Sequence, residues 1–237
     1  LRLQFAKLMR KRQDNPTGEG WIVIVVADDG SAASMIELQC ESAPVASNES
    51  FQSFADACAR QLLNGPGATS PDELLAQPDP DGGDSLQARY EDIGGQLREK
   101  IVITRMIKVD GPVGGYVHHD GKTGVLLQAT GENATADVLR DVAMHVASMK
   151  PSVVSPEQLD EDLVSAEQER LTENARSTGK PDEIIEQIVK GQLKGFYEEH
   201  GVLVAQPFVK DSSKSVSQAL AEAGMTASDF TLWVLGN

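Results

Sequence analysis

Short runs of β-branched and aliphatic residues alternate along the chain with longer stretches of helical periodicity. Residues 21–26 are such a run and predict a buried strand. A turn at residues 28–30, with Gly30 available for a positive φ, separates it from residues 35–40, where apolar and polar side chains alternate. Two strands joined by a tight turn predict a β-hairpin.

A helix is predicted after this hairpin, with Asn48 as its N-cap. Its apolar stripe consists of Phe51, Phe54, Ala55, Cys58 and Leu62. The Asn-Gly-Pro sequence at residues 64–66 is a strong turn signal and ends the helix. Residues 64–86 are rich in Gly, Pro and Asp, with one short predicted helix around Leu74 and Leu75, and a third strand is predicted at residues 101–109.

The same order of elements recurs in the second half of the chain. Residues 116–118 and 125–129 predict two strands around a turn, and a helix follows them. The apolar stripe of that helix consists of Val138, Leu139, Val142, Val146 and Met149. Phe54 and Cys58 fall on Val142 and Val146 when the chain is shifted by 88 residues. This weak internal duplication predicts two similar α+β subdomains.

Residues 155–200 carry sparse apolar stripes between charged flanks. The Ser-Pro-Glu-Gln sequence at residues 155–158 is a capping box that predicts a helix start, and Gly179 and Pro181 interrupt the helical pattern. The two stripes consist of Leu159, Leu163, Ala166, Leu171 and Ala175, and of Ile185, Val189, Leu193 and Phe196. Two helices joined by a short break predict an antiparallel hairpin, whose stripe is either core or a partner surface such as a dimer seam.

The last part of the chain predicts two short strands, at residues 202–209 and 232–235, around an amphipathic helix near Val216 and Leu220. Both strands can complete the second sheet. The predicted fold class is therefore α+β, with two related subdomains that each consist of an antiparallel sheet with packed helices, plus an inserted antiparallel helical hairpin. We expect residues 1–15 to be the end of a linker helix, residues 16–110 the first subdomain, and residues 111–237 the second, with the hairpin at about residues 156–199.

The charge balance narrows the classes of partner. The chain has 21 Lys and Arg against 36 Asp and Glu, so its net charge is −15. An acidic chain repels a phosphate backbone, which argues against nucleic acid as a partner. The sequence shows no signal peptide and no apolar run of about 18 residues. We therefore expect a cytoplasmic protein that does not bind membranes and, because the sequence begins with Leu1, a trimmed or partial chain.

Candidate catalytic and metal-binding residues have simpler interpretations. Neighbours on a strand point to opposite faces, so His118 and His119 are not expected to share a metal ion. Cys40 and Cys58 lie on predicted apolar faces and are expected to be buried, and His145 borders an apolar stripe as a structural histidine. The sequence shows no nucleophile–base pair and no metal-spaced cluster. It therefore predicts neither an enzyme nor a cofactor or metal site.

Several short segments keep an order and spacing that resemble one known family. They are residues 144–147 (Met-His-Val-Ala), 150–151 (Lys-Pro), 179–181 (Gly-Lys-Pro), 206–211 (Gln-Pro-Phe-Val-Lys-Asp) and 214–216 (Lys-Ser-Val). Residues 116–118 and 124–126 fit the same pattern in the second predicted hairpin. Together, across residues 16–237, these segments resemble bacterial elongation factor Ts.

The resemblance implies two related antiparallel α+β subdomains with a helical hairpin in the second, in agreement with the periodicity. It also implies a guanine-nucleotide exchange factor that promotes GDP release from elongation factor Tu during translation elongation. Such a factor binds the nucleotide-free partner and disturbs the Mg²⁺ and phosphate side of its site. A homodimer through the helical hairpin stays open. By the same resemblance, we expect a helical module before residue 1 and no C-terminal extension after Asn237.

The resemblance also assigns candidate contact residues. His118 matches the family's histidine in the second hairpin, which presses on the nucleotide domain of elongation factor Tu. The family loop Thr-Asp-Phe-Val-Ala, whose Asp-Phe pair is pushed between partner helices near the Mg²⁺ site, reads Ser42-Ala43-Pro44-Val45-Ala46 here. Val45 and Ala46 match, whereas the acid and the aromatic are replaced. The alternative function is therefore a homologue that binds elongation factor Tu but exchanges its nucleotide weakly.

Overall fold

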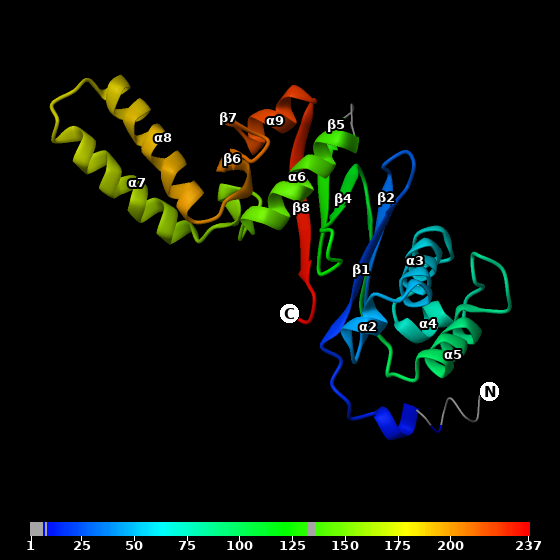
Figure 1. The fold of residues 1–237 in the computed structure, drawn as a ribbon. Helices are drawn as coiled ribbons and strands as arrows, with labels where there is room; N and C mark the ends of the chain where they lie inside the picture. The colour runs from blue at the N-terminus through cyan, green and yellow to red at the C-terminus, as the bar shows by residue number, and fades with distance from the viewer. Residues whose placement is uncertain (1–6, 8, 132–135) are drawn as a thin grey trace.

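Two three-stranded antiparallel sheets form the centre of the molecule (Figure 1), and the computed structural model describes residues 7, 9–131 and 136–237. The first sheet has the order β1 (Glu19–Val26), β2 (Ala32–Cys40), β3 (Val102–Asp110). The second has the order β4 (Val113–Val117), β5 (Thr123–Gly131), β8 (Met225–Val234). Each sheet thus begins with a hairpin and receives its third strand from later in the chain, so the predicted α+β class with two related halves is confirmed.

Helices cover the outer face of each sheet. The first half contains α2 (Ala43–Ala46), α3 (Glu49–Asn64), α4 (Pro71–Leu75) and α5 (Leu86–Leu97). The second contains α6 (Ala136–Met149), α7 (Glu161–Arg176), α8 (Asp182–Glu199) and α9 (Val216–Glu222), with short 3-10 turns at Pro156–Gln158 and Leu203–Ala205. Of the helix predicted at residues 1–15, residues 1–6 and 8 lie outside the described residues, while residues 9–12 are helical.

The helix that follows the first hairpin begins and ends where the sequence predicts. The Asn48 side chain accepts a hydrogen bond from the Ser50 amide, and Gly65 is the C-cap of α3. The predicted stripe of α3 is buried against Ile36, Leu38 and Cys40 of β2. The helix therefore closes the outer face of the first sheet.

Helix α5 is not among the predicted elements, which include none at residues 87–100. Ser85 caps it by accepting a hydrogen bond from the Ala88 amide, and Leu86 and Ile93 are buried. The Tyr90 hydroxyl donates to the Ile101 carbonyl (2.7 Å), which ties α5 to the beginning of the third strand. An apolar period at Leu86, Tyr90, Ile93 and Leu97 was present in the sequence and would have predicted this helix.

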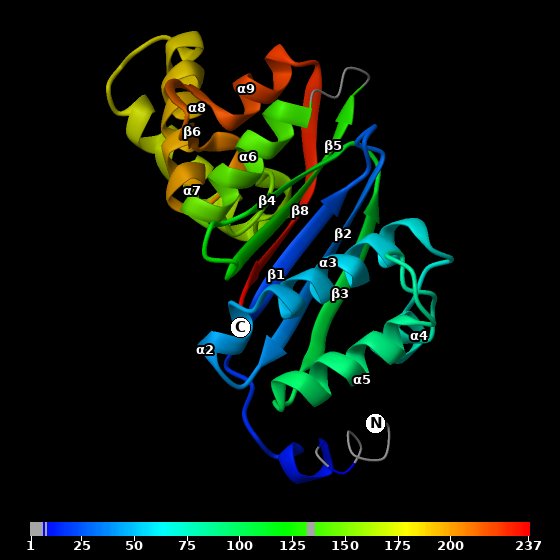
Figure 2. The same cartoon turned by 45° about the vertical axis from the view of Figure 1, so that its right-hand side comes forward.

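The two sheets pack face to face, so β2 is buried on both sides (Figure 2). Ala33 and Met35 meet Val113 and Leu126 of the second sheet in a shared core. Glycines permit the close approach: a Cβ on Gly124 would lie 2.6 Å from Cγ2 of Ile22. The polar residues that alternate along β2 consequently point into the protein instead of into solvent.

A buried ion pair satisfies the carboxylate of Glu37 in this interface. Glu37 accepts hydrogen bonds from Arg105 of β3, from the Thr104 hydroxyl (2.6 Å) and from the Gln39 amide (2.8 Å). Arg105 also donates to the Val234 carbonyl (2.8 Å) and lies over the Trp233 ring at 4.8 Å. A buried carboxylate needs such partners, and here they connect the first sheet to the last strand of the second.

The second core, which lies between the second sheet and helices α6 and α9, contains most of the predicted stripe of α6. The last residue of the stripe is exposed, contrary to the prediction. Leu139, Val142 and Val146 are buried, but Met149 is 47% exposed. Met149 is the last residue of its helix, and Lys150 turns the chain away with a φ of 47°. The stripe therefore ends one turn earlier than its periodicity suggests.

The helical hairpin projects from the second half (Figure 1) and consists of α7 and α8. Leu171 and Ala175 pack against Ile185 and Val189. The capping box at residues 155–158 forms a 3-10 turn, so the prediction that a long helix starts there was wrong: α7 begins only after Asp160, whose carboxylate accepts from the Asp162 amide. Leu163 and Ala166 of the predicted stripe are exposed, Leu163 to 43%, and neither belongs to the apolar cluster that joins α7 to α8.

Residues 202–209 do not join the second sheet, contrary to the prediction. Val202 bridges to Val153, and Pro207–Phe208 (β6) pairs with Asp211–Ser215 (β7) in a separate two-stranded sheet. Phe208 is buried in the second core and keeps this small hairpin against α6. β8 alone completes the sheet, and it is longer than the predicted residues 232–235 because it pairs with β5 from Thr123 to Gly131. Within the described residues, no helix combines the length and the apolar character needed to cross a membrane.

Candidate functional site

The turn between β4 and β5 is held by backbone bonds on both sides. The His118 amide donates to the Thr123 carbonyl (2.9 Å), and the His118 carbonyl accepts from the Gly121 amide (2.9 Å). The Ile22 amide donates to the Gly121 carbonyl (2.8 Å), which ties the turn to β1. Gly121 has a φ of 67°, and the Trp21 ring lies where a Cβ would be, so no other residue type fits here without strain.

The His118 side chain is half-buried and has a defined neighbour. Its Nδ1 lies 3.1 Å from the Tyr116 hydroxyl, and its ring centroid is 4.2 Å from that of His119. The expectation that these two histidines point to opposite faces was wrong, because β4 ends at Val117 and both residues lie outside the strand. Among the described residues, no group of three or more His, Cys, Asp or Glu side chains is arranged to hold a metal ion.

The segment Ser42–Ala46 forms a single helical turn, α2, with two faces. Val45 and Ala46 are 8% and 6% exposed. They belong to the core between the first sheet and its helices, so their side chains face inward. Ala43 and Pro44 are exposed. Proline is well placed at the start of a helix, where its missing amide proton costs nothing. The two residues that replace the family's Asp-Phe pair are therefore the ones that this turn presents to solvent.

A carboxylate from a distant part of the chain fixes the start of this turn. Glu99 accepts hydrogen bonds from the Glu41 amide (3.1 Å), the Ser42 amide (3.0 Å) and the Ser42 hydroxyl (2.5 Å). Glu99 is not among the candidate residues predicted from the sequence. Its partners lie 57 and 58 residues away in the sequence, and a contact over that separation cannot be predicted from a local sequence pattern.

Glu41 supports the same segment from the other side. Burial acts to raise the pKa of Glu41, but hydrogen bonds from the Lys100 amide (2.7 Å), Asn15 (2.7 Å) and Arg12 (2.7 Å) outweigh it and lower that pKa. The carboxylate is therefore ionised at neutral pH and connects residues 12–15 to the end of β2. These contacts make the exposed turn part of a rigid framework.

The turn between β4 and β5, residues 118–122, is called the His118 turn below. It lies at the same end of the two sheets as α2 (Figures 1 and 2). Glu19, the first residue of β1, pairs with Cys40 just before α2. The same Glu19 forms an ion pair with Lys122 of the turn (2.9 Å). The structure therefore brings together two segments that are more than 70 residues apart in the sequence, as two projections on either side of one strand end.

The remaining candidates have structural environments. Cys40 is buried, and burial raises the pKa of its thiol to about 11, while burial also raises the pKa of Cys58. Neither thiol is a nucleophile at neutral pH. His145 is fully buried: its Nε2 lies 2.9 Å from the Gln206 side-chain oxygen, and its Nδ1 accepts from the Val209 amide (3.2 Å).

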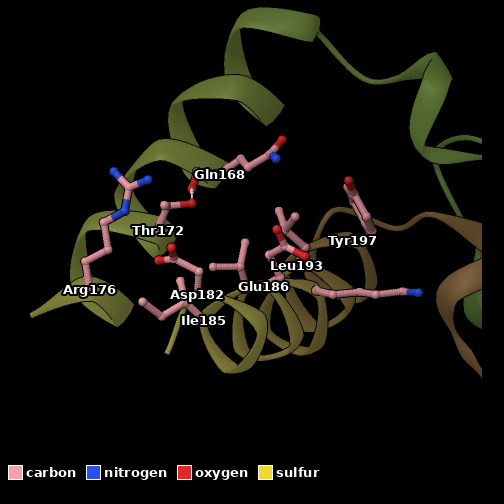
Figure 3. Close-up of a pocket in the computed structure, with 10 residues that line it drawn as sticks. Gln168, Thr172, Arg176, Asp182, Ile185, Glu186, Leu193 and Tyr197 are labelled. Carbon is pink, nitrogen blue, oxygen red and sulfur yellow. Dashed lines mark hydrogen bonds between the residues drawn. The ribbon is translucent and has the colours of Figure 1, made fainter. Parts of the chain in front are cut away.

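The helical hairpin carries a groove of about 610 Å³ between α7 and α8 (Figure 3). Its floor is apolar, with Ile185, Val189 and Leu193. Its walls carry mixed charge from Arg176, Asp182, Glu186 and Lys190. An apolar floor with a mixed polar rim is typical of a protein-binding surface. The groove offers no nucleophile paired with a base.

Known proteins resemble this chain over most of its length. A family model described as Elongation factor TS matches residues 44–237. Elongation factor Ts of Hyphomonas neptunium is 36% identical over 235 residues, which are 95% of this chain and 76% of the relative. The protein of the same name from Cytophaga hutchinsonii is 37% identical and covers 97% and 84%, and that from Aquifex aeolicus is 34% identical and covers 95% and 81%. With this coverage, and with the paired sheets and helical hairpin described above, the chain belongs to the elongation factor Ts family.

Proposed function

We propose that this protein is a guanine-nucleotide exchange factor that promotes GDP release from elongation factor Tu in the cytoplasm. The observation that carries the proposal is the pairing of the His118 turn with α2 at one end of the sheets, in a chain of this family. Two rigid projections suit a protein that deforms a partner's surface. We propose no catalytic residue and no cofactor, because exchange makes and breaks no covalent bond.

The mechanism that we propose is differential affinity. If the protein binds nucleotide-free elongation factor Tu more tightly than the GDP-bound form, then it must weaken GDP binding by the same factor. A coupling of this kind is typically worth about 1–3 kcal/mol, or roughly 5- to 150-fold in affinity. The surface residues must therefore fit the partner's open state and clash with its closed state.

In this proposal His118 contacts the nucleotide domain of the partner, and Ala43 and Pro44 contact it from the neighbouring projection. Val45 and Ala46 are packed in the core, so we assign them the orientation of α2 and not direct contact. Ser42 serves the same purpose through its bonds to Glu99. This assignment refines the sequence-based one, which placed Val45 and Ala46 at the partner.

We further propose that residues 16–110 and 111–237 act as two subdomains, with the helical hairpin as an insertion in the second. The hairpin of α7 and α8, which carries the groove, projects away from the turn between β4 and β5 (Figure 1). It can serve a second contact with elongation factor Tu or the pairing of two copies of this chain. The net charge of −15 supports a protein partner over a nucleic acid.

The direct test is release of labelled GDP from elongation factor Tu, with and without this protein. Acceleration at substoichiometric amounts is the expected result. Binding without acceleration would support the alternative, a homologue with weak exchange activity, which the replacement of Asp-Phe by Ala43-Pro44 favours. Absence of binding would contradict both.

A further inference from the structure

We infer that Tyr116 is a positioning residue for His118, an inference that rests on the proposed contact between His118 and elongation factor Tu. The hydroxyl of Tyr116 lies 3.1 Å from Nδ1 of His118. The backbone of His118 is already fixed by its bonds to Thr123 and Gly121. The contact with Tyr116 adds a hydrogen bond to the imidazole ring, which also lies beside the His119 ring.

The tyrosine is itself held in place. It lies on β4, paired with Val125 of β5, and its ring packs against the second core. Both residues are half-buried, and their ring centroids are 6.3 Å apart. A side chain anchored in the sheet therefore extends its hydroxyl to a side chain at the edge of the turn.

We assign Tyr116 as the donor in this hydrogen bond, and this assignment selects one tautomer of the ring. A neutral imidazole has one donor and one acceptor nitrogen, and a phenol O–H is a good donor. When Tyr116 donates to Nδ1, the proton of His118 resides on Nε2. No bond to Nε2 is present within the described part of the chain, so the turn presents a single N–H donor whose direction the tyrosine sets.

The partner feature that fits this donor is a hydrogen-bond acceptor, such as a backbone carbonyl, on the surface that meets the turn. Without the tyrosine hydroxyl, the ring would distribute over both tautomers, and its orientation would be less restricted. The ring would then have to be ordered when it binds the acceptor, and this loss of side-chain entropy would weaken the contact. In the wild-type protein the ring is ordered before binding.

The test is Tyr116→Phe, which removes one oxygen atom and keeps the ring. In the free protein, the ¹⁵N shifts of His118 should change from those of a single Nε2–H tautomer to those of a mixture. The rate of GDP release from elongation factor Tu should fall about 3- to 10-fold, as expected for the loss of one hydrogen bond. In a His118→Ala background, Tyr116→Phe should have no further effect.

Tyr90→Phe is the matched control. It removes the bond from the Tyr90 hydroxyl to the Ile101 carbonyl in the first half of the molecule. It should leave the His118 nitrogen shifts and the GDP release rate unchanged.

Three results would overturn the inference. Unchanged His118 shifts in Tyr116→Phe would show that the hydroxyl does not set the tautomer, whatever the exchange activity. Changed shifts with a normal release rate would show that positioning has no consequence for exchange. A His118→Ala variant with full activity would remove the proposed role of His118, and the role of Tyr116 in exchange with it, even if the tautomer result stood.

Discussion

Glu99 fixes the start of the exposed α2 turn through three hydrogen bonds. Its carboxylate accepts hydrogen bonds from two backbone amides and one hydroxyl. A glutamine side chain has only one acceptor oxygen for these three donors. We expect Glu99→Gln to lower the free energy of unfolding by ~1–3 kcal/mol, because partly buried donors lose a charged acceptor. Urea unfolding measures this, and Glu186→Gln on the exposed side of α8 is the control. Equal stability of the two variants would contradict the anchoring role.

His145 should make stability depend on pH. Burial lowers its pKa, although the bond to Gln206 acts in the opposite direction. The unfolded chain, with a histidine pKa of about 6.5, therefore takes up a proton more readily than the folded protein. The stabilisation is complete above pH ~6.5 and is lost as pH falls from there through the lower folded pKa.

The corresponding experiment compares urea unfolding at pH 8 and pH 5. His145→Gln should reduce the difference in unfolding free energy between the two pH values, since the uptake of that proton is removed. His119→Gln, at an exposed histidine, should leave the difference as in the wild type. A pH dependence that survives in His145→Gln would assign the effect to other groups.

Single residues with local partners could be predicted from the sequence, and those with distant partners could not. Asn48 and Gly65 are recognisable because a cap acts within one helical turn. The contact of Tyr116 with His118 could be expected from the predicted strand at residues 116–118, since residues two apart on a strand share a face, although in the structure β4 already ends at Val117. Glu99 and Glu37 depend on pairing across 57 or more residues, which only the folded chain reveals.

At the level of elements, the packing of the two sheets depends on glycine. A Cβ on Gly124 of β5 would lie 2.6 Å from Cγ2 of Ile22 and 2.9 Å from the sulfur of Met35. We expect Gly124→Val to destabilise the protein by ~1–3 kcal/mol through overpacking. Gly195→Ala on α8, where a Cβ meets nothing within 4 Å, should instead stabilise it by about 0.5–1 kcal/mol. Thermal unfolding of both variants checks this, and equal shifts in the same direction would contradict it.

Elements with a strong period were predicted, and elements defined by tertiary pairing were not. The hairpins, α3 and α6 follow directly from their patterns. Residues 202–209 are mostly apolar, but they contain a 3-10 turn, and their partners are Val153 and β7 and not the second sheet. The alternation in β2 could not reveal that a second sheet covers its polar face, because the packing of sheets is not encoded in one strand's period.

For the molecule as a whole, the altered α2 turn should limit exchange. Ala43 and Pro44 are exposed, so Asp and Phe can replace them without disturbing the core, and an acid suits the first turn of a helix. Burying a phenylalanine against the partner contributes about 1.5–3 kcal/mol. We expect the double variant Ala43→Asp, Pro44→Phe to speed GDP release about tenfold or more. An unchanged or slower rate would mean that this surface meets its partner in a different way.

We propose that the protein prefers nucleotide-free elongation factor Tu to the GDP-bound form. The most direct measurement is its affinity for that partner, determined by titration calorimetry without nucleotide and with saturating GDP and Mg²⁺. We predict a decrease of roughly 5- to 150-fold when GDP is present, matched by the same factor in GDP affinity when this protein is present. Equal affinity for the two forms of elongation factor Tu would contradict the account, because a protein with no preference cannot promote release.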